Sequence, residues 1–139
     1  MKKLLCLSLF ALATAFSCAG AQAQVIVIAN PSVKAVDAAR SDLKDIFSGA
    51  STSLGGSHVI PVLLKAGSVN DEFLAAYIGK TDAAFRASWR NQVFSGQATM
   101  PRSVDSDAAM VEYVAHNPGA VGYIGKASPH EGVKVIAVK

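Results

Sequence analysis

The loop at residues 65–70 carries the groups best suited to hold a small anion. It follows an apolar stretch and opens a helical pattern. The first N–H groups of a helix lack internal partners, and the helix dipole adds roughly half a positive charge there. Gly67 lets an anion approach the backbone, and Ser68 and Asn70, on either side of Val69, can donate side-chain hydrogen bonds. The alternative is a helix capped by Ser68 without any ligand.

Two further groups of polar residues are candidates for the same task. Asn30 and Ser32 follow the first predicted strand, and ligands of open α/β sheets often bind beyond the carboxyl ends of strands. Three arginines can supply a cation to an acidic ligand or partner, with a solvated surface position as the alternative for each. They are Arg86, Arg90 and Arg102.

Other chemistries find little support in the residue pattern. His58, His116 and His130 include no pair at the i, i+3 or i, i+4 spacing of a helical metal site. No Gly-x-Ser-x-Gly elbow is present. Trp89 and Tyr123 can stack on a ligand, but their positions favour the core. The sequence predicts a protein that is not an enzyme, with no metal and no cofactor.

Strand-like and helix-like stretches alternate along the chain, which predicts an α/β fold with helices on a mostly parallel or mixed sheet. Apolar runs predict strands at residues 25–29, 58–64, 120–125 and 133–138. Helices are predicted at 41–47, 68–78, 81–95 and 107–116. The Ser- and Gly-rich residues 50–57 are predicted to form a mobile loop.

The helix ends and one core stripe can also be assigned. Ser41, Ser68 and Thr81 are the expected N-caps, and glycines at 49, 79 and 96 follow the expected ends. The third helix carries an inward stripe at i, i+4 and i+8, made of Phe85, Trp89 and Val93.

The run Asn-Pro-Gly-Ala-Val-Gly-Tyr-Ile at residues 117–124 leads from a helix into a strand. Pro118 cannot continue a helix, and Gly119 can take the positive φ of a helix exit. The run resembles the PGA(I/V)GY element of the phosphate-binding proteins of ABC transporters. Four more pieces resemble that family in the same order: VIVIANPS at 25–32, LKDIFSG at 43–49, Trp89 with VFSG at 93–96, and PR at 101–102.

The resemblance implies a single lobe of the type 2 periplasmic binding protein-like fold, a mixed sheet flanked by helices. Complete family members have two lobes, and one lobe cannot close around a ligand by itself. In the family, an Arg-x-Asp-Gly-Ser-Gly-Thr loop supplies much of the phosphate cage. Here Gly67 and Ser68 keep the Gly-Ser step, whereas the residues at the Arg, Asp, second Gly and Thr positions are Leu64, Ala66, Val69 and Asn70.

Loss of the arginine and the aspartate predicts weak phosphate binding. A bidentate arginine contact with an oxyanion is worth about 1.5–3 kcal/mol. Lys65 is one strand position from Leu64 and is therefore expected on the opposite face.

Residues 1–23 are predicted to be an export signal, which leaves residues 24–139 as the domain. Lys2 and Lys3 precede an apolar stretch, and small residues up to Ala23 offer a signal-peptidase site. Two alternatives are a lipid anchor at Cys18 and a membrane span, for which the apolar stretch falls short of about 20 residues. Both cysteines lie in this segment, so the exported domain has no disulfide.

The charge of the predicted exported domain argues against nucleic acid as a partner. Of the thirteen Lys and Arg, two lie in the signal, so eleven remain against ten acids and the net charge is about +1. No stripe of basic residues with interleaved aromatics is present, which argues against nucleic acid. Two functions remain: capture of a small oxyanion, phosphate first, in connection with ABC-type uptake; or a protein-interaction module with a degenerate ligand site. Its partner would be an inner-membrane transporter or another periplasmic protein.

The exported protein should begin at Gln24 and stay free in the periplasm, because the Ala-x-Ala pattern is better formed than the lipobox before Cys18. Intact-mass analysis of the exported product checks this. A lipid adduct on Cys18 would contradict both the cleavage site and the location.

Overall fold

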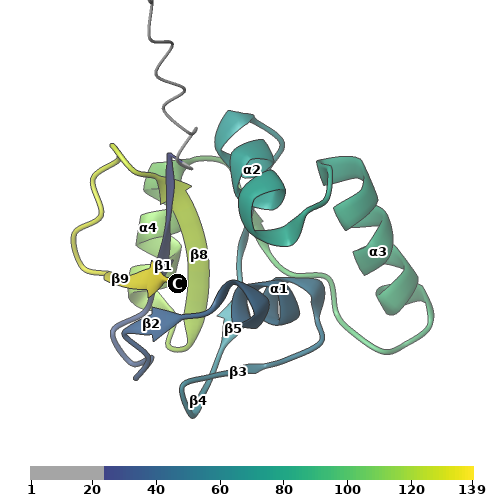
Figure 1. The fold of residues 1–139 in the computed structure, drawn as a ribbon, viewed down its shortest axis with the longest axis horizontal. Coiled ribbons are helices and arrows are strands. Elements are labelled where there is room, and N and C mark those ends of the chain that lie inside the picture. Colours follow the sequence, from purple (N-terminus) through teal and green to yellow (C-terminus); the bar gives the residue numbers. More distant parts are fainter. Residues whose placement is uncertain (1–23) are drawn as a thin grey trace, which may run out of the picture.

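The computed structural model describes residues 24–139, and the predicted export signal with its two cysteines lies outside this range. Its main sheet has five strands in the order β2-β9-β1-β8-β5 (Figure 1). Central β1 is antiparallel to both neighbours, and each outer strand is parallel to the strand beside it. The predicted mixed sheet is thus confirmed. The bounds are β1 Val25–Ala29, β2 Asp37–Ala38, β5 Ile60–Pro61, β8 Ala120–Gly125 and β9 Lys134–Val138.

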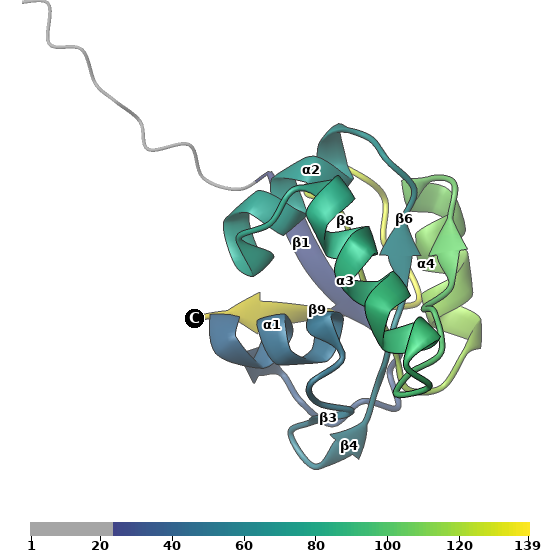
Figure 2. The same cartoon turned by 90° about the vertical axis from the view of Figure 1, so that its right-hand side faces the viewer.

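Helices cover both faces of this sheet (Figures 1 and 2). They are α1 Arg40–Ser48, α2 Ser68–Phe73, a π-helical turn η1 Leu74–Ile78, α3 Asp82–Phe94 and α4 Asp107–His116. Neighbouring residues of β8 show the two layers: a Cβ on Gly122 would meet Met110 of α4, whereas Tyr123 packs on Phe47 of α1 and Phe73 of α2. The sheet therefore lies between α4 and the pair α1–α2, and α3 packs outside α1.

The predicted strand at residues 58–64 is interrupted in the structure. It is divided among β4 (Ser57–His58), β5 and β6 (Leu63–Leu64). The backbone stays extended, but its partners change: the Val62 N–H donates to Val121 of β8, and the next N–H, of Leu63, donates to Arg102, which precedes β7 (Ser103–Val104). Because successive N–H groups of a strand point to opposite edges, this segment joins β8 on one side and β7 on the other.

The segment at residues 50–57, which was predicted to be a mobile loop, contains part of a short hairpin. This segment holds β3 (Ser53–Leu54), which forms an antiparallel hairpin with β4. Leu54 is buried, and the Val59 N–H donates to the Thr52 carbonyl at 2.8 Å. The Gly55–Gly56 turn, with φ of 57° and 82°, closes the hairpin. A Ser- and Gly-rich composition also suits a tight hairpin, and Leu54 anchors it to the core.

One of the three predicted N-caps is confirmed. The Thr81 hydroxyl accepts from the Ala84 N–H at 3.2 Å. Helix α1 instead begins at Arg40 with Ala39 as N-cap, whose N–H donates to the Asp42 carboxylate, so Ser41 lies inside the helix. An acid at the third helical position can thus satisfy the N–H of the N-cap residue even where that residue has no side-chain acceptor.

The cap prediction for the second helix also fails. Gly67 is the N-cap of α2, and Ser68 is the first helical residue, exposed and without a capping hydrogen bond. Two of the predicted helix ends are confirmed: Gly49 and Gly79 adopt φ of 86° and 74° directly after α1 and η1.

The inward stripe of α3 is shorter than predicted. Phe85 and Trp89 are buried, and the Trp89 indole N–H donates to the Phe47 carbonyl at 2.9 Å. Val93 is 40% exposed. Helix α1 ends at Ser48, whose carbonyl accepts from Gln92, so the last turn of α3 has no helix beneath it. Trp89 and Tyr123 both belong to the core, as predicted.

Trp89→Ala should lower the free energy of unfolding by about 3–5 kcal/mol, because it removes a large buried side chain. Val93→Ala on the same helix is the matched control and should cost less than about 1 kcal/mol. Urea denaturation of both variants checks the pair. Near-equal losses would show that α3 is not anchored through Trp89.

Candidate functional site

The start of α2 is an exposed turn with unsatisfied backbone donors. The Asp71 N–H is the first to close a helical hydrogen bond, to the Gly67 carbonyl at 2.9 Å. The N–H groups of the three preceding helical residues therefore have no partner within the helix. A Cβ on Gly67 would meet only the Lys65 carbonyl, at 3.9 Å, so the space beside this backbone is open. The turn can receive an anion from solvent.

Asn70 turns away from this opening and into the protein. Its side chain is 1% exposed. The Tyr123 hydroxyl donates to the Asn70 Oδ1 at 2.5 Å and accepts from the Leu64 N–H at 3.0 Å. The Asn70 Nδ2 donates to the Asp82 Oδ1 at 2.8 Å. Both ends of the amide are thus used internally.

Arg86 of α3 closes these contacts into a loop. Its Nε donates to the Asp82 Oδ1 at 2.9 Å, and its Nη2 donates to the Leu64 carbonyl at 2.9 Å. Beginning and ending at the Leu64 backbone, the connected groups form what we call the Leu64 circuit: Leu64, Tyr123, Asn70, Asp82 and Arg86. It joins β6, β8, α2 and α3.

The circuit gives two residues of the predicted anion-binding loop a structural role. The two residues that stand at the family's Arg and Thr positions, Leu64 and Asn70, hold the lobe together from within. Arg86 brings a cation to the same strand exit from another helix, but the Asp82 carboxylate balances its charge at 2.9 Å. Asp82 was not identified from the sequence, and its place in the first turn of α3 gave only a helix-dipole signal.

Two other carboxylates near the opening also have hydrogen-bond or ion-pair partners. Lys65 forms an ion pair with Asp105 at 2.5 Å, at an exposed position where such pairs contribute little. Asp107 accepts from the Gly125 N–H at 3.0 Å and from the Ser128 hydroxyl at 2.6 Å. Val69, half-buried, lies beside Gly125. The two hydrogen bonds to Asp107 come from neutral groups, so its negative charge is not balanced, and an anion at this opening would depend on the α2 backbone.

Asn30 and Ser32 serve the helix exit at the other end of β8. The Asn30 amide donates to the carbonyls of Val114 and Ala115 at 2.8 and 3.1 Å, which closes the end of α4. The Ser32 hydroxyl accepts from the Gly119 N–H at 3.0 Å. Gly119 has a φ of 79°, as predicted, and a Cβ there would lie 2.9 Å from the His58 carbonyl.

The two predicted groups of site residues do not meet. Asn30 bonds to Ala120, at the start of β8, whereas Val69 lies beside Gly125, at its end. Five residue steps along a strand span about 16 Å. One small anion cannot contact both groups.

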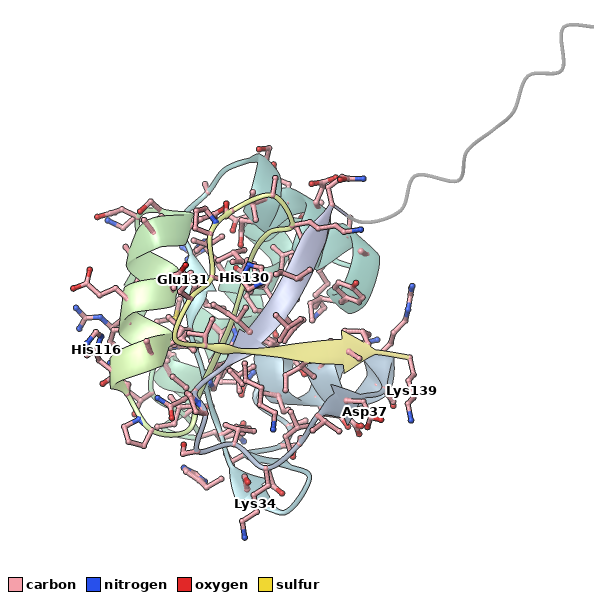
Figure 3. All side chains as sticks on the ribbon, turned by 90° about the vertical axis from the view of Figure 1, so that its left-hand side faces the viewer. Lys34, Asp37, His116, His130, Glu131 and Lys139 are labelled. Carbon is pink, nitrogen blue, oxygen red and sulfur yellow. The ribbon has the colours of Figure 1, made fainter. Side chains whose placement is uncertain are left out.

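The histidines are also dispersed. Figure 3 shows His116 on α4 and His130 in the segment before β9. Across residues 24–139, no group of three or more His, Cys, Asp or Glu is placed to hold a metal ion. No helix in that range is long and apolar enough to cross a membrane.

Comparison with known proteins agrees with the fold. No family model matches the chain, and no curated protein matches it. The solved structures that match include an ABC-type phosphate transport receptor from Vibrio cholerae (24% identity, TM-score 0.64), PstS from Borrelia burgdorferi (20%, 0.60), and a phosphate ABC transporter substrate-binding protein from Clostridium perfringens solved with bound phosphate (19%, 0.63).

These alignments cover 83% or 84% of this chain but only 44% to 47% of the neighbours. The chain therefore has the fold of part of a phosphate ABC transporter substrate-binding protein. The predicted single lobe of a periplasmic binding protein-like fold is confirmed, and the chain spans less than half the length of the proteins it resembles.

Tyr123→Phe should weaken the loss of stability at alkaline pH. Burial raises the pKa of the Tyr123 phenol, against the opposing effect of its hydrogen bond from Leu64. The unfolded chain releases this proton at an ordinary pKa of about 10, while the folded protein keeps it. Above that pH the unfolded state binds fewer protons, so stability falls as pH rises.

Urea denaturation between about pH 8 and pH 11 measures how the free energy of unfolding changes with pH. This range brackets the phenol's ordinary pKa. The slope should be shallower in Tyr123→Phe than in the parent. Tyr113→Phe, at a half-buried position on α4, is the control and should keep the parent slope. Equal slopes in all three proteins would contradict the role assigned to the buried phenol.

Proposed function

We propose that this protein captures a small oxyanion, phosphate first, at the start of α2, in connection with ABC-type phosphate uptake in the periplasm. The observation that supports this most is the exposed start of α2, where the backbone at Gly67 has open space beside it and the first N–H groups have no partner within the helix. The fold adds to it, because the C. perfringens neighbour was solved with bound phosphate.

The donors of the proposed site are mostly backbone groups. The N–H groups of Ser68 and Val69 and the exposed Ser68 hydroxyl point toward the same opening in this proposal, with Gly67 as the point of close approach. Asn70 contributes its N–H group only, because its amide side chain is held in the Leu64 circuit. Asn30 and Ser32 support the fold rather than the ligand.

Binding is expected to be weak. The lobe has no arginine at position 64, the nearest guanidinium is paired with Asp82, and a second lobe is absent from these residues. We expect a Kd in the micromolar to millimolar range, about −8 to −4 kcal/mol.

A second function has its own observation. The last turn of α3 presents Phe94 at 95% exposure beside Val93 at 40%. A nearly free phenylalanine next to a second apolar residue favours docking of an inner-membrane transporter or another periplasmic protein. In this alternative the ligand site is degenerate.

Ser68→Asp should lower the phosphate affinity at least about tenfold, or 1.4 kcal/mol, because it places a carboxylate where the anion would sit. The helix itself should not suffer, since an acid in the first turn complements the dipole. Isothermal titration with phosphate and with sulfate measures both proteins. Ser41→Asp is the matched control: it makes the same change, also exposed, in the first turn of α1, and should bind as the parent does.

The outcomes separate the two functions. Equal phosphate binding by the parent and Ser68→Asp would move the anion to another place on the protein. No heat from either anion up to several millimolar would leave the docking function.

A further inference from the structure

A cavity of about 370 Å³ opens on the side of the molecule away from α2. Its lining comes from α1, the β3–β4 hairpin, β5, α3 and the loop at residues 95–102. None of residues 67–70 lines it. Its volume is within the roughly 300–1,000 Å³ of typical small-molecule sites.

The cavity lies along the edge of the 59–63 segment that faces away from β8. This edge is covered by other segments at residues 59 and 63, which leaves only Pro61 uncovered. The Val59 N–H donates to the Thr52 carbonyl at 2.8 Å, and the Leu63 N–H donates to the Arg102 carbonyl at 2.8 Å. Pro61 lies between these two contacts and has no N–H to offer. A strand of another chain cannot pair with an edge one residue long that lacks a donor. The shape therefore suits a compact occupant.

The lining combines an apolar interior with positive charge only. Trp89, Pro61 and Met100 provide apolar surface, and Ile60 at the rim is 50% exposed. His58 and Arg102 are the two lining residues that can be cationic, and none of the residues that line this cavity in the described chain is acidic.

The Arg102 guanidinium lies over an aromatic ring at the border between this cavity and a second hollow, which Asp105, Glu112 and Tyr113 help to line. The guanidinium carbon lies 5.1 Å from the centre of the Tyr113 ring. A cation fixed on an aromatic face beside an apolar hollow is suited to a carboxylate that carries an apolar body. We propose that this cavity binds a small carboxylate with an aromatic or branched aliphatic body. The site is independent of the proposed oxyanion site at α2.

Trp89 makes the proposal directly measurable. It is the one tryptophan of the chain, it lines the cavity, and its indole N–H is fixed on the Phe47 carbonyl. A ligand that enters must change the surroundings of this indole, so its fluorescence reports occupancy without a label.

The test is a fluorescence titration of the full chain with 4-methylbenzoate and with the neutral 4-methylbenzamide. The carboxylate should cause a saturable change in Trp89 emission, and the amide should bind at least tenfold more weakly. Inorganic phosphate should leave the emission unchanged. No saturable change with the carboxylate, or equal affinity for carboxylate and amide, would overturn the proposal.

Three variants locate the site. Ala98→Phe fills the cavity from the 95–102 loop and should abolish the signal, while Ala83→Phe, at an exposed position early in α3, should not. Arg102→Gln should reduce the affinity for the carboxylate to that for the amide. If Ala98→Phe fails to fold by circular dichroism, Arg102→Gln decides the matter. Carboxylate binding that survives both Ala98→Phe and Arg102→Gln would place the ligand elsewhere and overturn the assignment.

Discussion

The buried hydroxyl of Tyr123 sets the arrangement of this lobe. A phenol in the core must find hydrogen-bond partners, because an unsatisfied polar group there costs about 1–3 kcal/mol. It accepts from the backbone of β6 and donates to the side chain of Asn70 on α2. Its ring also stacks on Phe73, with 3.8 Å between centroids. One side chain therefore fixes where α2 lies against the sheet and which way Asn70 faces.

That constraint explains the character of the candidate anion site. Because Tyr123 and Asp82 take both ends of the Asn70 amide, α2 meets solvent mainly through its backbone and Ser68. Arg86, a cation that contacts the strand exit, is bound to Asp82 and Leu64. Polar side chains at this end of the lobe thus stabilise its packing, and an anion would have to rely on N–H groups and the helix dipole.

Strand β8 separates the two proposed sites. Its last residues lie beside α2, and its first residues lie beside the exit of α4, where Asn30 and Ser32 hold the turn around Gly119. The cavity next to Pro61 is at this second end, since Ile60 is paired with Ala120. A separation of about 16 Å along the strand would keep a ligand at one proposed site out of contact with a ligand at the other.

The sequence alone determined the elements that local chemistry dictates. Residues 25–29 and 120–125 form strands and 107–116 a helix with the predicted bounds, because β-branched runs and the Pro118–Gly119 exit leave few alternatives. Thr81 caps its helix for the same local reason. Only the tertiary structure decided the rest. Asn70 faces inward because Tyr123, 53 residues away, needs an acceptor. Val93 is exposed because α1 ends too early to cover it, and residues 58–64 change partners because two distant strands reach opposite edges of one segment. Such contacts join residues far apart in the chain, and no local pattern encodes them.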